Sequence, residues 1–137
     1  MSQENVEVVR RLWLAYVRQD YETSTAALDD AVELWSDPRA NMETGLVSGR
    51  EAVVASITGF VSSFDDYWCE EPQELIDVGD WVIVVVRSGG RGRTSGVQVS
   101  QVWTVAYKLR HGRIVRIEFH PDKREAMTSI EAAELSE

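Results

Sequence analysis

Residues 97–120 alternate between apolar and polar positions, a pattern that predicts a long β-hairpin. One parity of the first strand is apolar except for Gln101, and its apolar members are Val97, Val99, Trp103, Val105, Tyr107 and Leu109. The other parity carries smaller or polar side chains, namely Ser100, Val102, Thr104, Ala106 and Lys108. We therefore expect this hairpin to form one wall of the molecule, with its apolar parity facing inward.

The turn of this hairpin sets which side chains meet across it. A two-residue loop at 111–112 would place Val105 opposite Glu118. A three-residue loop at 110–112, with its glycine at positive φ, places Val105 opposite Ile117 instead. Because the second register pairs apolar with apolar side chains, we predict the three-residue loop.

Helical spacing dominates the first half of the chain. A first amphipathic helix ending near Gln19 is predicted by apolar residues on one face, namely Val6, Val9, Trp13, Tyr16 and Val17. Asp20 can cap a shorter second helix over 21–29. The sequence Ser-Gly-Arg-Glu at 48–51 has the form of a capping box, and it predicts a third helix reaching about Phe64.

The remaining apolar runs predict strands. A short strand is expected at 32–35, and a second over 67–78 that is interrupted at Pro72. The β-branched run at 81–87 implies a strand buried on both faces. A tail helix capped by Asp122 follows the hairpin. Helices grouped before an antiparallel sheet indicate an α+β fold with helices over one face of a curved sheet.

Composition narrows the class of protein. The chain has 137 residues, of which 44% are hydrophobic and 27% charged, as expected of one globular domain. Its formal net charge of -9 argues against a nucleic-acid partner. No apolar run reaches the ~18 residues of a membrane span, and the N-terminus lacks a signal-peptide pattern. With Cys69 alone, we expect no disulfide, no metal site, no cofactor and a cytoplasmic location.

Several short motifs, in this order and spacing, carry a resemblance that spans nearly the whole chain. They are Ala15-Tyr16-Val17-Arg18-Gln19-Asp20, Val32-Glu33-Leu34-Trp35-Ser36-Asp37-Pro38, Ser48-Gly49-Arg50-Glu51-Ala52-Val53, the run from Glu71 to Asp80, Ser95-Gly96-Val97, and Gly112-Arg113-Ile114-Val115-Arg116. The sequence resembles the SnoaL-like branch of the NTF2-like superfamily, whose members share a ketosteroid-isomerase-like cone.

The resemblance implies a single SnoaL-like (NTF2-like) domain over 1–137. It implies an α+β cone, in which a curved antiparallel (mixed) β-sheet has three helices from the N-terminal half packed over its concave face. It also implies a conical pocket for an apolar small molecule and a homodimer joined through the outer sheet face, where we place Val102, Thr104 and Ala106. The family contains isomerases, cyclases, dehydratases, hydrolases and proteins without assigned activity, so the fold implies a pocket and not a reaction.

Asp37 is the first catalytic candidate. The Asp-Pro pair after a strand resembles the general base of the ketosteroid isomerases, and a carboxylate beside Trp35 in a partly dry pocket would have a raised pKa. Asp37 could equally shape a turn before Pro38. The isomerase's tyrosine would fall on Leu12 and its second acid near Gln101, so only the base position is matched.

Tyr16 and Gln101 are the other catalytic candidates. Tyr16 lies on the buried face of the first helix, where its hydroxyl could donate to an oxyanion or bond to the backbone as a core tyrosine. Gln101 interrupts an apolar stripe, so its amide meets either a ligand or a neighbour. Aromatic residues that could line the pocket are Trp13, Trp35, Trp68, Trp103, Phe60 and Phe119. His120 and Asp122 lack a third metal ligand, and we place His120 at a surface or interface.

Three functions are compatible with these residues. The first is acid–base catalysis of the isomerase, cyclase or hydrolase type on an apolar small molecule, with Asp37 as base and Tyr16 or Gln101 as polar partner. The second is ligand binding in the same pocket without chemistry. The third is a dimeric interaction module whose pocket is filled by its own side chains. The shortage of titratable groups on the pocket-facing parity favours binding over catalysis.

Overall fold

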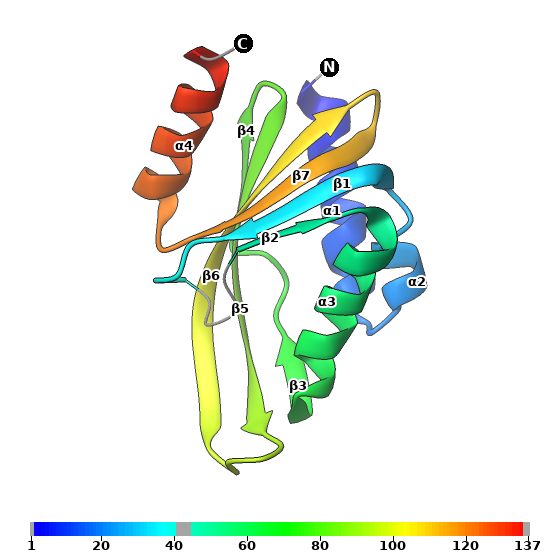
Figure 1. Ribbon diagram of the computed structural model, residues 1–137, viewed down its shortest axis with the longest axis vertical. Coiled ribbons are helices and arrows are strands. Elements are labelled where there is room, and N and C mark those ends of the chain that lie inside the picture. The colour runs from blue at the N-terminus through cyan, green and yellow to red at the C-terminus, as the bar shows by residue number, and fades with distance from the viewer. Residues whose placement is uncertain (1, 41–44, 136–137) are drawn as a thin grey trace.

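A strongly curved mixed sheet is the central feature of the computed structural model, which describes residues 2–40 and 45–135 (Figure 1). The strands follow the order β2-β1-β7-β6-β5-β3, and β4 pairs with β5 beside this path. β1 and β7 are parallel, and the other pairs are antiparallel. The strands are β1 (Leu28–Ser36), β2 (Gly45–Ser48), β3 (Phe64–Cys69), β4 (Glu74–Val78), β5 (Trp81–Gly92), β6 (Gln98–Arg110) and β7 (Arg113–His120).

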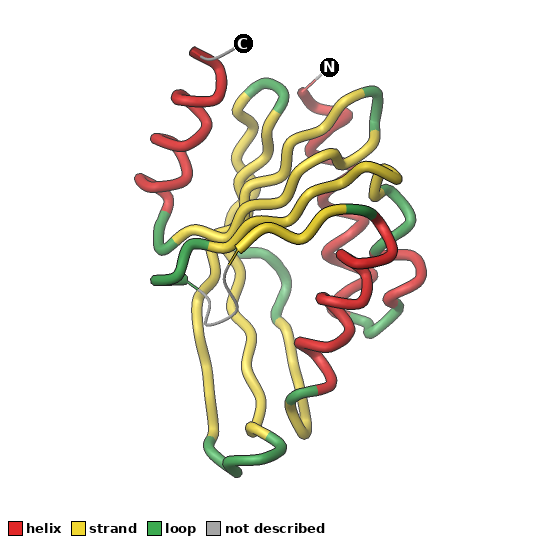
Figure 2. Tube along the Cα trace, in the orientation of Figure 1, coloured by secondary structure: helices red, strands yellow, loops and turns green. Residues whose placement is uncertain are grey.

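The helices divide between the two faces of this sheet. On the concave face lie α1 (Ser2–Val17), α2 (Tyr21–Ser24) and α3 (Arg50–Ser62), all from the N-terminal half as the sequence predicts (Figure 2). The C-terminal helix α4 (Lys123–Leu135) packs against the opposite face of β5, β6 and β7. The fold is thus an α+β cone, in which the tail helix covers part of the outside.

The predicted burial of β5 on both faces is confirmed, because every residue from Trp81 to Val86 is buried. Val82, Val84 and Val86 belong to the main core under α1, together with residues of β1, β6 and β7. Trp81 and Ile83 belong to a second core on the other face. That second core is completed by Ala106 of β6 and by Ala126 and Ile130 of α4. The β-branched run therefore reflects two separate cores that share one strand.

The predicted register of the β6–β7 hairpin is wrong. Arg110 pairs with Arg113 across a two-residue turn, in which the residues 111–112 have φ values of 53° and 74°. Such a turn matches the twist of the strands, and by itself it would place Val105 opposite Glu118. A bulge in β7 inserts one extra residue and moves Val105 opposite Phe119. Apolar side chains still meet, through a bulge and not through a longer loop.

The helix caps predicted at Asp20 and Asp122 are confirmed. Asp20 accepts a hydrogen bond of 3.2 Å from the Thr23 amide, so the cap of α2 is confirmed, although that helix ends at Ser24 because β1 begins at Leu28. The cap of α4 is also confirmed, since Asp122 accepts a hydrogen bond of 2.9 Å from the backbone N–H three residues later.

The capping box predicted at 48–51 is wrong. Ser48 is the last residue of β2, where it pairs with Glu33 of β1. The N-cap of α3 is Gly49, at φ 95° and without a side-chain hydrogen bond. Pairing in the sheet holds the Ser48 backbone away from the first turn of the helix. Residues 41–44, which precede β2, lie outside the described residues.

The strand expected over 67–78 is in fact two strands, β3 and β4, separated by the stretch that contains Pro72. Both strands pair with β5, β3 along its second half and β4 along its first half. β3 begins at Phe64, so the predicted end of α3 is late and residues 65–66 lie in the strand. The hairpin of β5 and β6 extends past the rest of the sheet as a long arm (Figure 1).

We predict that Ile130→Ala destabilises the protein by about 2–5 kcal/mol, because it leaves a cavity in the core beneath α4. Ile130 is fully buried there. The matched control is Leu135→Ala at the end of the same helix, where the side chain is 88% exposed, and it should change stability by less than about 0.5 kcal/mol. Urea denaturation measures both. Equal, small effects would show that α4 does not belong to the cooperative fold.

Candidate functional site

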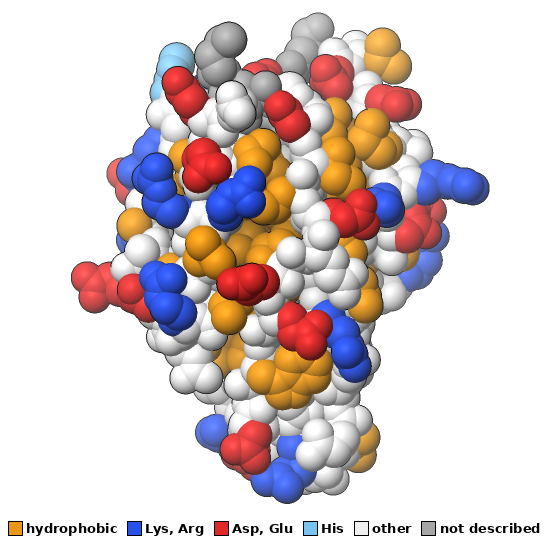
Figure 3. Space-filling view, turned by 180° about the vertical axis from the view of Figure 1, so that it is seen from behind, with side chains coloured by type: hydrophobic (Ala, Val, Ile, Leu, Met, Phe, Trp, Pro, Cys, Tyr) orange, Lys and Arg blue, Asp and Glu red, His pale blue; other side chains and the backbone are white. Residues whose placement is uncertain are grey.

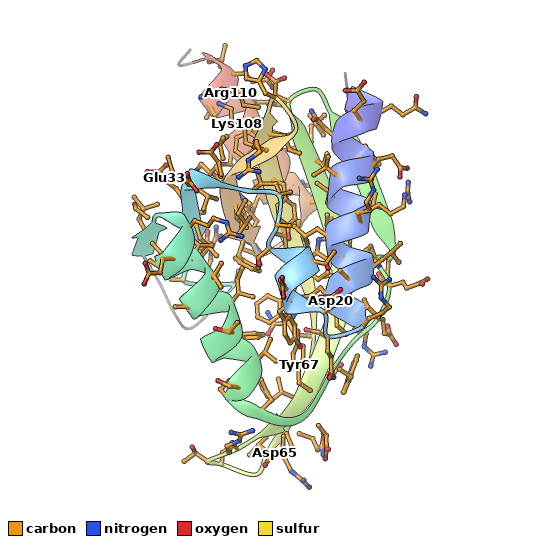
Figure 4. The ribbon with its side chains drawn as sticks, turned by 90° about the vertical axis from the view of Figure 1, so that its right-hand side faces the viewer. Asp20, Glu33, Asp65, Tyr67, Lys108 and Arg110 are labelled. Carbon is orange, nitrogen blue, oxygen red and sulfur yellow. The ribbon has the colours of Figure 1, made fainter. Side chains whose placement is uncertain are left out.

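A cavity of about 150 Å³ lies inside the cone, between the helices and the concave face of the sheet. α1 contributes Trp13 and Tyr16, which follow each other by one helical turn. α3 contributes Ile57 and Phe60 from the opposite side. Figure 4 shows this arrangement, with α1 and α3 flanking the side chains between them and Tyr67 near the narrow end. The cavity is therefore shaped by two helices that the curved sheet holds apart.

The sheet wall of the cavity is apolar and aromatic. Trp103 and Tyr107 come from β6, and Ile117 and Phe119 come from β7. The Trp103 ring packs edge to face against Phe119, with centroids 5.9 Å apart, and against Phe60, at 5.6 Å. These contacts fix the rings in place. Alternate residues of two paired strands therefore supply a continuous apolar wall.

Hydroxyl groups are the main polar feature of the cavity lining. The Tyr16 and Tyr67 hydroxyls form a hydrogen bond of 2.8 Å, in which either can be the donor. Beside them the Trp103 indole N–H donates to the Ser88 hydroxyl at 2.9 Å. All four of these side chains line the cavity. Together they form a short hydroxyl strip. The other polar residues that line the cavity are Ser24, Thr25, Ser36 and Ser56.

Burial keeps the tyrosines of the cavity protonated. It raises the pKa of Tyr16, and the neighbouring Tyr67 adds to that rise. Burial also raises the pKa of Tyr67, while the hydroxyls of Ser88 and Tyr16 oppose the rise. Burial likewise raises the pKa of Tyr107. At neutral pH these residues act as neutral hydrogen-bonding groups.

Charged side chains are missing from the cavity lining within the described part of the chain. The residues that line it include no Asp, Glu, His, Lys or Arg. Cys69 packs against the same core, but burial raises the pKa of its thiol to about 12, so it stays a neutral thiol. The cavity therefore offers shape and hydroxyl groups, and no charge.

Four of the six predicted aromatic residues line the cavity, and two do not. Trp13, Trp103, Phe60 and Phe119 are in its wall. Trp35 lies between two residues of β1 that face inward, so it points to the outer face, where it packs on His120 with centroids 5.5 Å apart. Trp68 is 37% exposed, with the Arg87 guanidinium 5.6 Å from its ring centroid. Strand alternation separates the two groups.

Asp37 lies outside the cavity lining, in the turn after β1. Its carboxylate accepts hydrogen bonds of 2.8 Å from both the backbone N–H and Nη2 of Arg39. These bonds lower its pKa to about 2, so the predicted rise in pKa is wrong. The physical reason is that Arg39, two residues later, folds back over the carboxylate and stabilises its charge. Asp37 is thus a charged turn residue at neutral pH.

Gln101 also lies outside the cavity lining. Its side-chain amide donates to the Ala40 carbonyl at 3.0 Å, so it bonds to a neighbour, which is the second of the two interpretations that the sequence allowed. The bond ties β6 to the turn that carries Asp37. Of the three catalytic candidates, the structure places only Tyr16 in the cavity.

Tyr67 and Ser88 were missed in the sequence analysis. Ser88 has the same parity as Val82, Val84 and Val86, so continuing the alternation along β5 would have placed it on the inner face. Tyr67 had a weaker signal, because β3 contains a register shift between Asp65 and Trp68. Its inward position depends on that irregularity.

A family model described as the SnoaL-like domain matches residues 9–117. This chain belongs to the SnoaL-like family. The match runs from the middle of α1 into β7 and includes every residue that lines the cavity except Phe119. No curated protein matches the chain.

Solved structures show the same NTF2-like fold. An NTF2-like protein of unknown function from Burkholderia pseudomallei is 22% identical, with 91% of this chain and 95% of that chain covered and a TM-score of 0.74. TerC co-crystallised with polyporic acid is 18% identical, with 93% and 98% covered and a TM-score of 0.70. A protein of ketosteroid isomerase-like fold from Catenulispora acidiphila, in complex with trimethylamine, is 11% identical, with 89% and 90% covered and a TM-score of 0.69.

Outside the cavity, this SnoaL-like protein has a buried charge cluster between the sheet and α4. Glu118 accepts hydrogen bonds of 2.7 Å from Arg116, 2.8 Å from His120 and 2.8 Å from Ser129 of α4. Its burial would raise the pKa of Glu118, but these three bonds outweigh burial and lower it to about 2. His120, which the sequence placed at a surface or interface, is buried in this cluster with 4% exposure. The cluster fastens the tail helix.

The described residues contain neither a metal-binding cluster nor a membrane-spanning helix. No group of three or more His, Cys, Asp or Glu side chains there could hold a metal ion. No helix of the described residues is long and apolar enough to cross a membrane. The hydroxyl strip in the cavity is the candidate site of this family member.

The Glu118 cluster predicts an acid-dependent loss of stability. Because the folded-state pKa is lowered from 4.5 to about 2, the stabilisation is present above the unfolded-state value and is lost as the pH falls between the two. Unfolding free energies of the unmodified protein and of Glu118→Gln should therefore converge between pH 4.5 and pH 2. The control is Glu125→Gln, whose side chain is 40% exposed. A gap between Glu118→Gln and the unmodified protein that does not change with pH would contradict the assignment.

Proposed function

We propose that this protein binds a small apolar molecule in the cavity of its cone, with Tyr16 and Tyr67 as the polar anchor. The observation that carries the proposal is an apolar cavity of about 150 Å³ with a hydroxyl pair in its wall. Binding sites for small molecules are concave and mostly apolar, with a few placed polar groups. The proposal treats residues 1–137 as one functional domain.

The size of the cavity supports binding over a packed core. Protein interiors are close-packed, and an unfilled void lowers stability in proportion to its volume. An apolar cavity of roughly 150 Å³ is large enough to take up a benzene molecule. The side chains of this protein leave a space of that size unfilled. This favours a ligand over an interaction module whose pocket is filled from within.

The residues that line the cavity determine which reactions the protein could catalyse there. Proton abstraction needs a base, and the described lining holds no carboxylate or imidazole. Asp37, the expected base, is charged and bonded to Arg39 outside the lining. Catalysis therefore enters the proposal only through Tyr16, whose hydroxyl could stabilise negative charge that develops on a substrate oxygen. Binding is the function that these observations support best.

Two related structures are consistent with a ligand in this fold. TerC was co-crystallised with polyporic acid, and the protein from Catenulispora acidiphila is in complex with trimethylamine. Their identities to this chain are 18% and 11%, so they support the idea of a small-molecule cone and do not indicate which ligand this chain takes.

We also propose a homodimer joined through the part of the outer sheet face that α4 leaves open. Exposed apolar side chains of that face are Leu46 (54% exposed), Trp68 (37%) and Val102 (50%). Exposed apolar groups on one face favour burial against a second copy. Thr104 is only 4% exposed, so Val102 replaces it as the residue to test.

The distribution of charged side chains and the net charge both argue against a nucleic-acid partner. Acidic and basic side chains are interspersed on the face seen in Figure 3, and the chain carries a formal net charge of -9. A phosphate backbone would need clustered Lys and Arg. A cytoplasmic location is also part of the proposal, and it is consistent with the single cysteine of the chain.

The binding proposal predicts that Ile57→Trp abolishes ligand binding, because the larger side chain fills the cavity that Ile57 lines. A library of small apolar fragments, titrated into ¹⁵N-labelled protein, should shift amide signals of α1, α3 and the inner strands in the unmodified protein. The control is Ala55→Trp, at an exposed position of the same helix, which should keep the binding. Fragments that shift signals equally in Ile57→Trp would show that the cavity is not the site.

The dimer proposal predicts that Val102→Glu yields monomers, because it replaces an exposed apolar side chain of the outer face with a charge. Sedimentation velocity at several concentrations measures the state of each protein. The control is Val97→Glu, since Val97 is 58% exposed next to the tip of the β5–β6 arm. A monomeric unmodified protein would end the proposal.

A further inference from the structure

We infer that the ligand of this cavity is an uncharged molecule about the size of one substituted ring, whose oxygen accepts a hydrogen bond from the Tyr16–Tyr67 pair. The inference rests on the proposed function, since it names the class of molecule bound at that site. It follows from hydrogen-bond counting, from the charge of the lining and from the cavity volume.

Hydrogen-bond counting shows a spare donor. The hydroxyls of Tyr16 and Tyr67 bond to each other at 2.8 Å, so one of them donates and the other accepts. Trp103 donates its N–H to Ser88, and an indole N–H cannot accept in return. The two tyrosine hydroxyls hold two protons, and the bond between them uses one. Whichever tyrosine donates in that bond, the proton of the other one is left to donate.

Because the spare hydroxyl proton lies in the cavity wall, it favours a ligand that carries a hydrogen-bond acceptor. Tyr16, Tyr67 and Ser88 all line the cavity, so a bound molecule is within their reach. A buried donor without an acceptor costs free energy, and a ligand oxygen removes that cost. A carbonyl, ether or phenol oxygen meets this need, whereas a hydrocarbon of the same shape does not.

The lining also selects against charged ligands. The described residues around the cavity carry no basic or acidic side chain, and burial raises the pKa values of Tyr16 and Tyr67. A carboxylate or an ammonium group in the cavity would lose its water without gaining a counter-ion, which is strongly unfavourable. An uncharged oxygen loses far less water and gains the tyrosine bond.

The volume limits the size of the molecule. About 150 Å³ accommodates one aromatic or aliphatic ring with a small substituent. The rings of Trp103, Phe60 and Phe119 meet edge to face around this space, which suits a flat ring as partner.

Three probes of one shape test the inference, namely acetophenone, ethylbenzene and benzoate. They share a ring and differ in having a neutral acceptor oxygen, no oxygen or a charged carboxylate. Titrations followed by ¹H–¹⁵N NMR at neutral pH give their dissociation constants. We expect acetophenone to bind roughly 2- to 10-fold more tightly than ethylbenzene, as one added hydrogen bond predicts. We expect benzoate to bind at least about 100-fold more weakly than acetophenone.

The double variant Tyr16→Phe/Tyr67→Phe keeps both rings and removes both hydroxyls. It should bind acetophenone and ethylbenzene equally. The matched control is Tyr21→Phe, because the Tyr21 ring packs on Tyr16 at 5.5 Å but does not line the cavity. That control should keep the preference for acetophenone. Amide spectra of each variant verify that it is folded. The three probes titrated into the unmodified protein test the preference for a neutral acceptor oxygen without any variant.

The outcomes separate the inference from the proposed function. Equal binding of acetophenone and ethylbenzene, with both lost in Ile57→Trp, would overturn the inference and leave the binding function in place. Tighter binding of benzoate in the cavity would do the same. A preference for acetophenone that survives in the double variant would overturn the role of the tyrosine pair. No cavity binding by any probe or fragment would overturn both.

Discussion

The pairing of β6 with β7 is the constraint on which the cavity depends. A shift of one residue in a strand pair moves every side chain of that strand to the other face. The two-residue turn of this hairpin alone would have produced such a mismatch, and the bulge in β7 corrects it. As a result Trp103 and Phe119 both face the cavity, while Glu118 lies on the outside. One inserted residue thus separates the apolar wall from the charged cluster.

The molecule keeps its two kinds of polar chemistry on opposite faces of one sheet. Hydroxyl groups lie inside the cone, where burial keeps Tyr16 and Tyr67 neutral. Carboxylates and guanidinium groups lie outside it, where Arg116 and Arg39 stabilise the charges of Glu118 and Asp37. A charge placed among the hydroxyls would be costly without a partner. The cavity therefore suits hydrogen bonding to neutral groups.

The tail helix α4 covers part of the outer sheet face and so limits which part of it can contact another molecule. α4 buries Ala126 and Ile130 against Trp81, Ile83 and Ala106, so this half of the face is an internal core. Ser129 and Glu125 add polar ties to Glu118 and Arg39. The exposed apolar side chains that remain lie further along the arm and on β2, at Val102 and Leu46. The proposed interface with a second copy is consequently restricted to that part.

Local sequence determined much of the fold. The apolar alternation, the run at 81–87 and the caps at Asp20 and Asp122 depend on neighbours in the chain, and they predicted an α+β fold with helices over one face of a curved sheet. Motifs in order and spacing were enough to indicate the SnoaL-like family. Tyr16 and four aromatic residues of the pocket followed from the same periodicity.

Tertiary structure decided the chemistry of the site. Arg39 turned Asp37 into a bonded turn residue, the Ala40 carbonyl took the amide of Gln101, and Tyr67 came into the cavity from β3 to meet Tyr16. None of these partners is visible in a pattern of apolar and polar residues, because a hydrogen bond depends on the distance and angle between two atoms. Those distances are set by the curvature, bulge and packing of the whole sheet, and only the folded chain contains them.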